Sequence, residues 1–225
     1  MKLVTLIFRL GFAILLLLSL PARADDTLWN KTLAQAKASK QFVPGDIDIA
    51  VTFGRDPLTP KRFRSHLTGW ENGNPVYSTT EVNPLPGASQ DRGKSIVTMI
   101  NAIVEITGEL PDPQLKALRL EGQVIDGKSW TEFQQSETGI GKKLVAKIWV
   151  HPETGCLHQV DANTHAALQA DARIHISYMA DATGRCLPQQ IDADIDLLIP
   201  FKKTKMKLTQ TSSNWVERPQ TPKSR

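Results

Sequence analysis

The sequence lacks the short motifs that identify many enzymes. It contains no Gly-x-Ser-x-Gly or Ser-x-x-Lys nucleophile motif and no glycine-rich phosphate loop. Its acidic residues alternate along predicted strands, which places them toward water rather than in a catalytic pair. We therefore expect a protein that is not an enzyme, has no catalytic residues and needs no cofactor.

The sequence also has little excess charge once its first residues are set aside. The whole chain carries 27 Lys and Arg against 23 Asp and Glu, a net charge of +4. Residues 1–24 contain three cations and no acid, so their removal lowers the net charge to +1. The basic pI is therefore no evidence of nucleic-acid binding, and we expect no nucleic-acid partner.

Long apolar runs are missing from the chain except at its amino terminus. Lys2 and Arg9 supply positive charge, residues 10–20 are apolar, and Ala22-Arg23-Ala24 has the small-x-small pattern of a cleavage site. The apolar run is short for a membrane span, and Pro21 follows it. We predict a signal peptide over 1–24, which leaves a soluble mature domain outside the cytoplasm. The alternative is an uncleaved membrane anchor.

Cysteine is scarce as well, with Cys156 and Cys186 as the only two. In an exported protein, two thiols meet an oxidising compartment that favours a disulfide between them. Both residues follow turns at the same end of the predicted meander, on strands two apart. Backbones two strands apart are about 9–10 Å from each other, whereas a disulfide needs Cα atoms within about 7 Å. We expect the disulfide, which requires either that the turn ends curl together or that segment 162–171 breaks the strand order. Two buried free thiols remain the alternative.

The order of helical and strand-like patterns indicates a mainly β protein. Residues 25–42 have helical spacing of apolar side chains, and short β-runs with turn signals between them follow. Segment 95–107 fits a helix face and a strand face, with helix slightly favoured. We expect one domain over 25–216, built as an antiparallel sheet, and a disordered tail over 217–225. The predicted strands are 47–53, 62–70, 75–82, 118–125, 129–135, 144–150, 157–160, 173–179, 187–198 and 202–214.

Alternation along these strands predicts a sheet with one apolar face and one polar face. On the polar face, the acids of 192–196 and the lysines of 202–207 are expected side by side across a hairpin, where opposite charges are mildly stabilising. The apolar face must be covered by helices, by a second layer or by a ligand. We hypothesise that these apolar side chains line a ligand-binding hollow: Leu144, Ala146, Ile148, Val150, Ile174, Ile176, Tyr178, Ile191, Ala193, Ile195 and Leu197.

Four potential metal ligands lie close together in the sequence. They are His151, Cys156, His158 and His165, and their spacing matches no zinc pattern. We expect surface or turn roles for the histidines and no metal site.

The second half of the chain resembles the LolA/LolB-like superfamily of periplasmic lipoprotein carriers and its relatives, including RseB-type sensors. The resemblance is carried by the strand and Asp-Gly turn of 120–130, by the aromatic strand and Thr-Gly turn of 147–155, and by the strand ending near Trp215. It covers roughly residues 115–216. It implies an unclosed, curved antiparallel sheet, a half-barrel, with helices in or over its concave face. No functional residue of the family maps onto this chain, and the cysteine pair departs from the family pattern.

The resemblance implies binding of a lipid or of the acyl chains of a lipidated protein. We therefore expect a periplasmic, non-enzymatic binding protein for a hydrophobic ligand, with a role in lipid or lipoprotein trafficking in a Gram-negative envelope. The alternative is an envelope protein-interaction or sensing module, in which the hollow is filled by the protein's own helices and a protein partner docks on the sheet edge or on the polar face.

Overall fold

The computed structural model describes residues 27–54, 60–82, 110–125, 127–139, 141–166, 170–199 and 202–219. The predicted signal peptide and segment 95–107 lie outside these ranges, as do residues 220–225 of the predicted tail. The described residues form one helix and ten strands.

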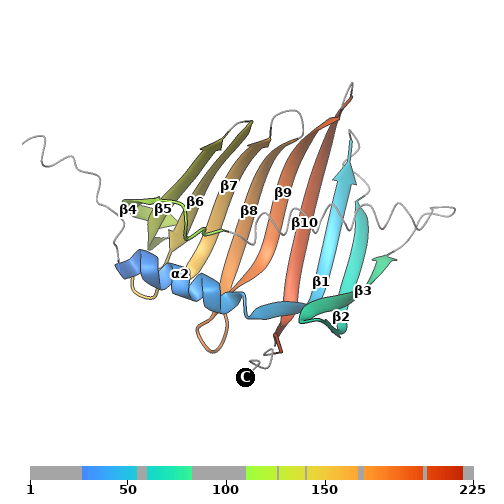
Figure 1. Ribbon diagram of the computed structural model, residues 1–225, viewed down its shortest axis with the longest axis horizontal. Coiled ribbons are helices and arrows are strands. Elements are labelled where there is room, and N and C mark those ends of the chain that lie inside the picture. The colour runs from blue at the N-terminus through green and yellow to red at the C-terminus, as the bar shows by residue number, and fades with distance from the viewer. Residues whose placement is uncertain are drawn as a thin grey trace, which may run out of the picture.

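Helix α2, Thr27–Ser39, confirms the predicted amino-terminal helix. Leu28, Trp29, Thr32 and Ala36 are its buried residues, and their spacing places them on one side of the helix. The β6–β7 turn packs against this helix so closely that a Cβ on Gly155 would lie 2.8 Å from the backbone nitrogen of Thr32. In Figure 1, α2 lies across the ends of the strands at one side of the sheet.

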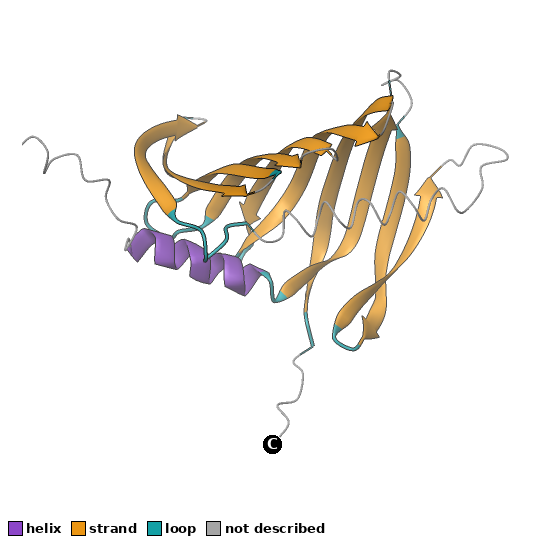
Figure 2. Cartoon of the chain, turned by 45° about the horizontal axis from the view of Figure 1, so that its top comes forward, coloured by secondary structure: helices purple, strands orange, loops and turns teal. Residues whose placement is uncertain are grey.

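All ten strands belong to one antiparallel sheet that does not close. The spatial order is β3-β2-β1-β10-β9-β8-β7-β6-β5-β4, so β3 and β4 are the two edges (Figure 1). The sheet curves strongly at the end that carries β4 and β5 (Figure 2). This confirms the expected mainly β, curved and open antiparallel sheet with few helices. The strands are β1 Phe42–Phe53, β2 Lys61–Glu71, β3 Asn74–Val82, β4 Ala117–Ile125, β5 Lys128–Gly139, β6 Lys142–Val150, β7 Leu157–Ala166, β8 Ala170–Ala180, β9 Cys186–Ile199 and β10 Lys202–Glu217.

The last strand joins two meanders that are far apart in the sequence. Strands β4 to β10 follow one another in order, and β1 to β3 form a second meander. Strand β10 pairs with β1 from Phe42↔Glu217 to Phe53↔Met206. The ordered strand therefore continues past the predicted domain end at 216, and the backbone N–H of Arg218 donates to the Gln41 carbonyl at 2.7 Å.

The inner face of the sheet is the side that carries Phe133, Ile148 and Val160 and contacts α2. These three side chains lie in one register row, which continues to Ile176 on β8. Each of the three is 0 % exposed. The ring of Trp29 on α2 lies 4.8 Å from that of Phe133, centroid to centroid. Burial of apolar side chains of this size stabilises the fold by about 1.5–3 kcal/mol each.

The outer face carries the charged side chains, as alternation predicts. Asp194 on β9 is opposite Lys207 on β10, and their carboxylate and ammonium groups lie 3.4 Å apart. Trp149 departs from the prediction, because it lies on this face and is only 8 % exposed. It is opposite Glu132, which is also buried and accepts a hydrogen bond from Gln134 at 2.8 Å. A large ring beside an internally bonded carboxylate leaves little of either exposed to water.

Cys156 and Cys186 form a disulfide with a Cα–Cα distance of 5.6 Å, so the free-thiol alternative is wrong. The β7–β8 ladder stops at Gln159↔Ser177, whereas the β8–β9 ladder continues to Ala180↔Cys186. The last residues of β8 do not pair with β7, which allows the turn ends that carry Cys156 and Cys186 to approach each other. A disulfide fits an oxidising, extracytoplasmic compartment. Within the described ranges, no helix has the length and apolar character needed to cross a membrane.

Candidate ligand-binding cavity

A cavity of about 500 Å³ opens on the inner face, where β8, β9, β10 and β1 approach the carboxyl end of α2. We call it the strand-end cavity. Most of its described lining is aliphatic, aromatic or proline. The lining residues are Ala36, Ser39, Lys40, Phe42, Val43, Pro44, Ile47, Pro75, Tyr77, Leu110, Leu157, Ile176, Tyr178, Pro188, Ile191, Gln210, Ser212, Trp215 and Arg218.

The floor of the cavity is one register row of the sheet. Ile176 on β8 is opposite Ile191 on β9, which is opposite Gln210 on β10. All three side chains are buried, and Gln210 is only 4 % exposed. Its Nε2 donates to the Ser212 hydroxyl at a long 3.4 Å. The floor therefore combines an apolar surface with a buried amide that, among the described residues, has one weak hydrogen bond.

Strand β10 changes character where it enters the cavity. Met206 and Leu208 are each 1 % exposed on the inner face and belong to the core. Gln210 and Ser212 continue the same alternation and are also buried, but they are polar. Buried polar groups lower stability unless they are hydrogen-bonded. The change from apolar to polar side chains on one face therefore indicates a role other than packing.

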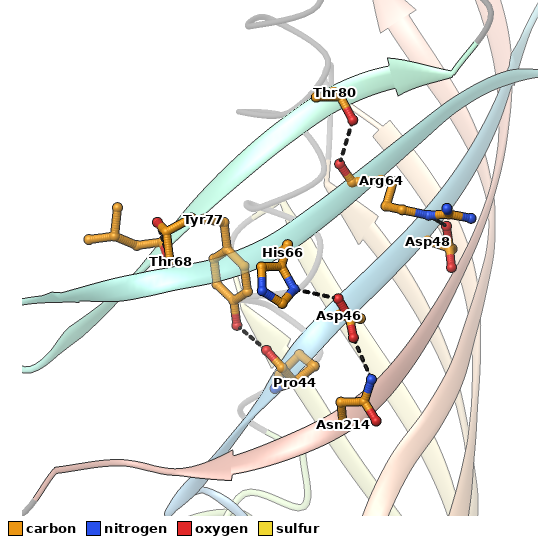
Figure 3. Close-up of polar contacts among 10 residues, drawn as sticks. Pro44, Asp46, Asp48, Arg64, His66, Thr68, Tyr77, Thr80 and Asn214 are labelled. Atoms are coloured by element: carbon orange, nitrogen blue, oxygen red, sulfur yellow. Dashed lines mark hydrogen bonds and ion pairs between the residues drawn. The ribbon is translucent and has the colours of Figure 1, made fainter.

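Two tyrosines from different strands contribute to the wall. The Tyr77 hydroxyl on β3 donates to the Pro44 carbonyl on β1 at 2.8 Å (Figure 3). Burial raises the pKa of Tyr77 to about 12, and the charge of Arg218 opposes the rise. Burial also raises the pKa of Tyr178. Both phenols are therefore neutral over the physiological range.

A polar cluster fastens β10, β1 and β2 together on the outer face near the cavity. Asp46 on β1 is hydrogen-bonded to His66 Nδ1 on β2 at 2.6 Å and accepts from the amide of Asn214 on β10 (Figure 3). The hydrogen bond to His66, followed by that from Asn214, lowers the pKa of Asp46. These contacts link β1, β2 and β10 beside the cavity.

The segment before β4 is fixed by a buried glutamine. Gln135 on β5 is 0 % exposed, and its Nε2 donates to the Asp112 carbonyl at 2.7 Å and to the Leu115 carbonyl at 3.1 Å. Its Oε1 accepts from the Asp112 N–H at 3.1 Å. Gln135 thereby positions a segment that begins with Leu110, which is buried and reaches the cavity wall.

The eleven predicted lining residues fall into three groups. Ile176, Tyr178 and Ile191 line the strand-end cavity. Leu197 lies in β9, and its side chain is outside the described set. The remaining predicted residues are buried or partly buried in the core, on the inner face, away from the cavity lining: Leu144, Ala146, Ile148, Val150, Ile174, Ala193 and Ile195.

Most of the cavity was missed by sequence reasoning. Its walls come from β1, β3 and the end of β10, and the β1–β10 pairing joins strands about 160 residues apart along the chain. One local signal was present, namely the change from Met206 and Leu208 to Gln210 and Ser212 at alternate positions of one strand.

The four potential metal ligands do not converge. Cys156 is in the disulfide, and His165 is bonded to Asp171 on β8. The rings of His151 and His158 both contact Trp130, with His158 stacked on it at 4.1 Å between centroids. Within the described ranges, no group of three or more His, Cys, Asp or Glu side chains is arranged to hold a metal ion.

Comparison with protein-family models, with curated proteins and with solved structures finds no match to this chain. The resemblance to the LolA/LolB-like superfamily therefore stays a prediction from the sequence.

Proposed function

We propose that the protein is a non-enzymatic binding protein for a hydrophobic ligand, a lipid or the acyl chain of a lipoprotein, and that the ligand occupies the strand-end cavity. The observation that carries the proposal is the cavity itself, a concave apolar space with two buried polar side chains, Gln210 and Ser212, in its lining.

Size and chemistry both support a small-molecule site. Ligand pockets in proteins have volumes of about 300–1,000 Å³ and are mainly apolar, with a few polar groups that orient the ligand. A cavity of about 500 Å³ lies within this range. A ligand hydroxyl, carbonyl or ester could complete the hydrogen bonding of Gln210, whose one hydrogen bond among the described residues, to Ser212, is long.

The proposed compartment is the periplasm of a Gram-negative envelope. The disulfide supports an oxidising location. Among oxidising compartments, the predicted signal peptide and the resemblance to lipoprotein carriers favour the periplasm. In this setting the ligand is a membrane lipid or a lipidated protein in transit. The expected mature protein begins at Asp25, which an intact-mass measurement of exported material would test.

The second candidate function is an envelope protein-interaction or sensing module. It is favoured by the two sheet edges, because β3 and β4 each pair with one neighbouring strand among the described residues. An unpaired edge can accept a strand from a partner. In that case the cavity contributes to folding rather than to ligand binding.

The decisive experiment is displacement of a neutral fluorescent apolar probe, together with native mass spectrometry of gently purified protein. Wild type should bind the probe and should retain a co-purified lipid. The variant Ile191→Trp places a large ring in the cavity floor, so it should stay folded and lose probe binding.

The matched control is Ile148→Trp, the same change in the packed row of the inner face. Ile148 is 0 % exposed, and overpacking a filled core costs about 1–3 kcal/mol. This control should melt at a lower temperature and still bind the probe at temperatures where it is folded. If wild type binds no apolar probe and carries no lipid, the proposal is wrong and the interaction module takes its place.

A further inference from the structure

We infer that the ligand of the strand-end cavity carries an anionic head group, a carboxylate or a phosphate, which Lys40 and Arg218 bind at the rim. This inference rests on the proposed function and names the class of ligand. It predicts an anionic amphiphile with a single apolar chain directed toward the cavity floor.

The charged residues of the described lining are all of one sign. Lys40 and Arg218 are the charged residues in the described lining, and no Asp or Glu is among those residues. This contrasts with the outer face, where cations and anions alternate and pair, as in Lys207 with Asp194. A cavity rim with cations alone attracts an anion and disfavours a cationic ligand.

The backbone and Nε contacts of Arg218 fix its position. Its backbone N–H donates to the Gln41 carbonyl at 2.7 Å, and its Nε donates to the Lys40 carbonyl at 3.1 Å. These two acceptors are carbonyls just beyond the carboxyl end of α2, where free carbonyls would otherwise repel an anion. Arg218 thus satisfies these carbonyls and brings a positive charge to the rim.

Neighbouring carboxylates of the described residues do not neutralise the rim cations. Within the described residues, no carboxylate forms an ion pair with Lys40 or Arg218. Arg185 provides the comparison, because it also lies near the cavity, over the ring of Phe42 at 4.1 Å. Its guanidinium is paired with Asp181 at 2.6 Å. A guanidinium with unused N–H donors is suited to a carboxylate or phosphate, which it can bind through two parallel hydrogen bonds.

The polarity of the cavity changes along its depth. Lys40 is exposed, Arg218 is half-buried, and the floor residues Ile176 and Ile191 are buried. Tyr77 lies near Arg218, with its hydroxyl already donated to Pro44. An amphiphile with its head at the cations and its chain over the isoleucines matches this gradient. The reverse orientation would bury the charge among apolar groups, which is strongly unfavourable.

The test compares three ligands that share one oleoyl chain and differ in the head group. Oleate carries a carboxylate, 1-oleoyl-lysophosphatidate carries a phosphate, and 1-monooleoylglycerol is neutral. Displacement of the neutral probe from full-length wild type should give at least one anionic ligand an affinity about tenfold above that of the neutral one, as expected for a charge-assisted contact. The better anion then identifies a free fatty acid or a phospholipid head group as the source.

Two rim variants and one control localise the effect. Arg218→Gln and Lys40→Gln should each lower the affinity for the preferred anion severalfold and leave the affinity for 1-monooleoylglycerol unchanged. Lys37→Gln removes an exposed charge from the last turn of α2, close to Lys40 in the sequence but outside the described lining, and should change neither affinity.

The inference is overturned if wild type binds the three ligands equally, or if Lys37→Gln weakens anion binding as much as the rim variants do. Both of these results leave the proposed function intact. If wild type binds none of the three, the proposed function fails as well.

Discussion

Two regions of the same sheet face differ in what lies over them. In the packed region, Phe133, Ile148 and Val160 form a row that α2 covers through Trp29. In the cavity region, Ile191 and Gln210 continue the sheet face but line an open space. Strand alternation is the same in both. The difference teaches that alternation determines which side chains point inward, whereas the elements packed opposite determine whether they meet protein or a cavity.

The polar side chains of the two regions differ in the same way. Gln135, in the packed region, makes three hydrogen bonds to the backbone of Asp112 and Leu115. Within the part of the chain that the structure describes, Gln210, in the cavity region, makes one long hydrogen bond, to Ser212. A fully bonded buried amide is a structural element, whereas a weakly bonded one facing a cavity is available to a ligand.

The largest expected effect comes from a charge placed in each region. Ile148→Asp should unfold the protein, because an unpaired carboxylate in a close-packed row costs several kcal/mol. Ile191→Asp should leave it folded at a lower melting temperature and abolish probe binding, since water can reach a carboxylate in the cavity. Thermal melting by circular dichroism, with probe displacement for the folded variant, measures both. Equal unfolding of the two variants would remove the distinction between the regions.

The disulfide should have the next largest effect, because it links the residue before β7 to the first residue of β9. Cys156 and Cys186 are 30 residues apart in the sequence. In the chain-entropy model, a loop of this length corresponds to about 3–4 kcal/mol of stabilisation. The double variant Cys156→Ala/Cys186→Ala should lose about that much free energy of unfolding in a urea titration. Thiol labelling of denatured, unreduced wild type should find no free cysteine, and labelling of both would contradict the assignment.

The two glutamines give a smaller, directly matched pair. Gln135→Leu should lower the free energy of unfolding by about 2–3 kcal/mol, because it removes three hydrogen bonds to partly buried backbone groups of Asp112 and Leu115. Gln210→Leu should change stability by less than about 1 kcal/mol, because it removes one long hydrogen bond. Urea titration of both variants measures the difference. Losses of similar size would show that Gln210 is a structural residue like Gln135.

The sequence was sufficient to predict the features that depend on local pattern. The helix over Thr27–Ser39, the hairpins and the inward alternation of Ile174, Ile176 and Ile191 follow from spacing and turn residues. The pairing of acids with lysines across β9 and β10 followed in the same way, because those strands are joined by a short connection.

The position of the cavity depended on contacts that are distant in the sequence. Pro44 and Trp215 are opposite each other only because β10 pairs with β1, and no local pattern encodes that pairing. The burial of Trp149 likewise depends on neighbours from other strands, such as Glu132 on β5. Side chains from separate strands therefore form the site. Alternation along individual strands predicted only Ile176, Tyr178 and Ile191 of the described lining.

The smallest expected effect is the acid sensitivity of the outer-face cluster beside the cavity. Hydrogen bonds from His66 and Asn214 lower the pKa of Asp46 below its ordinary 3.8. A carboxyl group whose pKa is lowered by folding stabilises the protein above its unfolded pKa and loses this contribution as the pH falls through the folded value. The difference in melting temperature between wild type and Asp46→Asn should therefore have its full size above about pH 5 and should shrink below about pH 4. Asp181→Asn is the comparison outside the cavity wall. Hydrogen bonds from Thr183 and Arg185 lower the pKa of Asp181 further, so its difference should persist to a more acidic pH. Melting curves of the three proteins across this range measure both effects. A difference for Asp46→Asn that does not shrink in acid would show that this carboxylate contributes nothing to holding β1, β2 and β10 together.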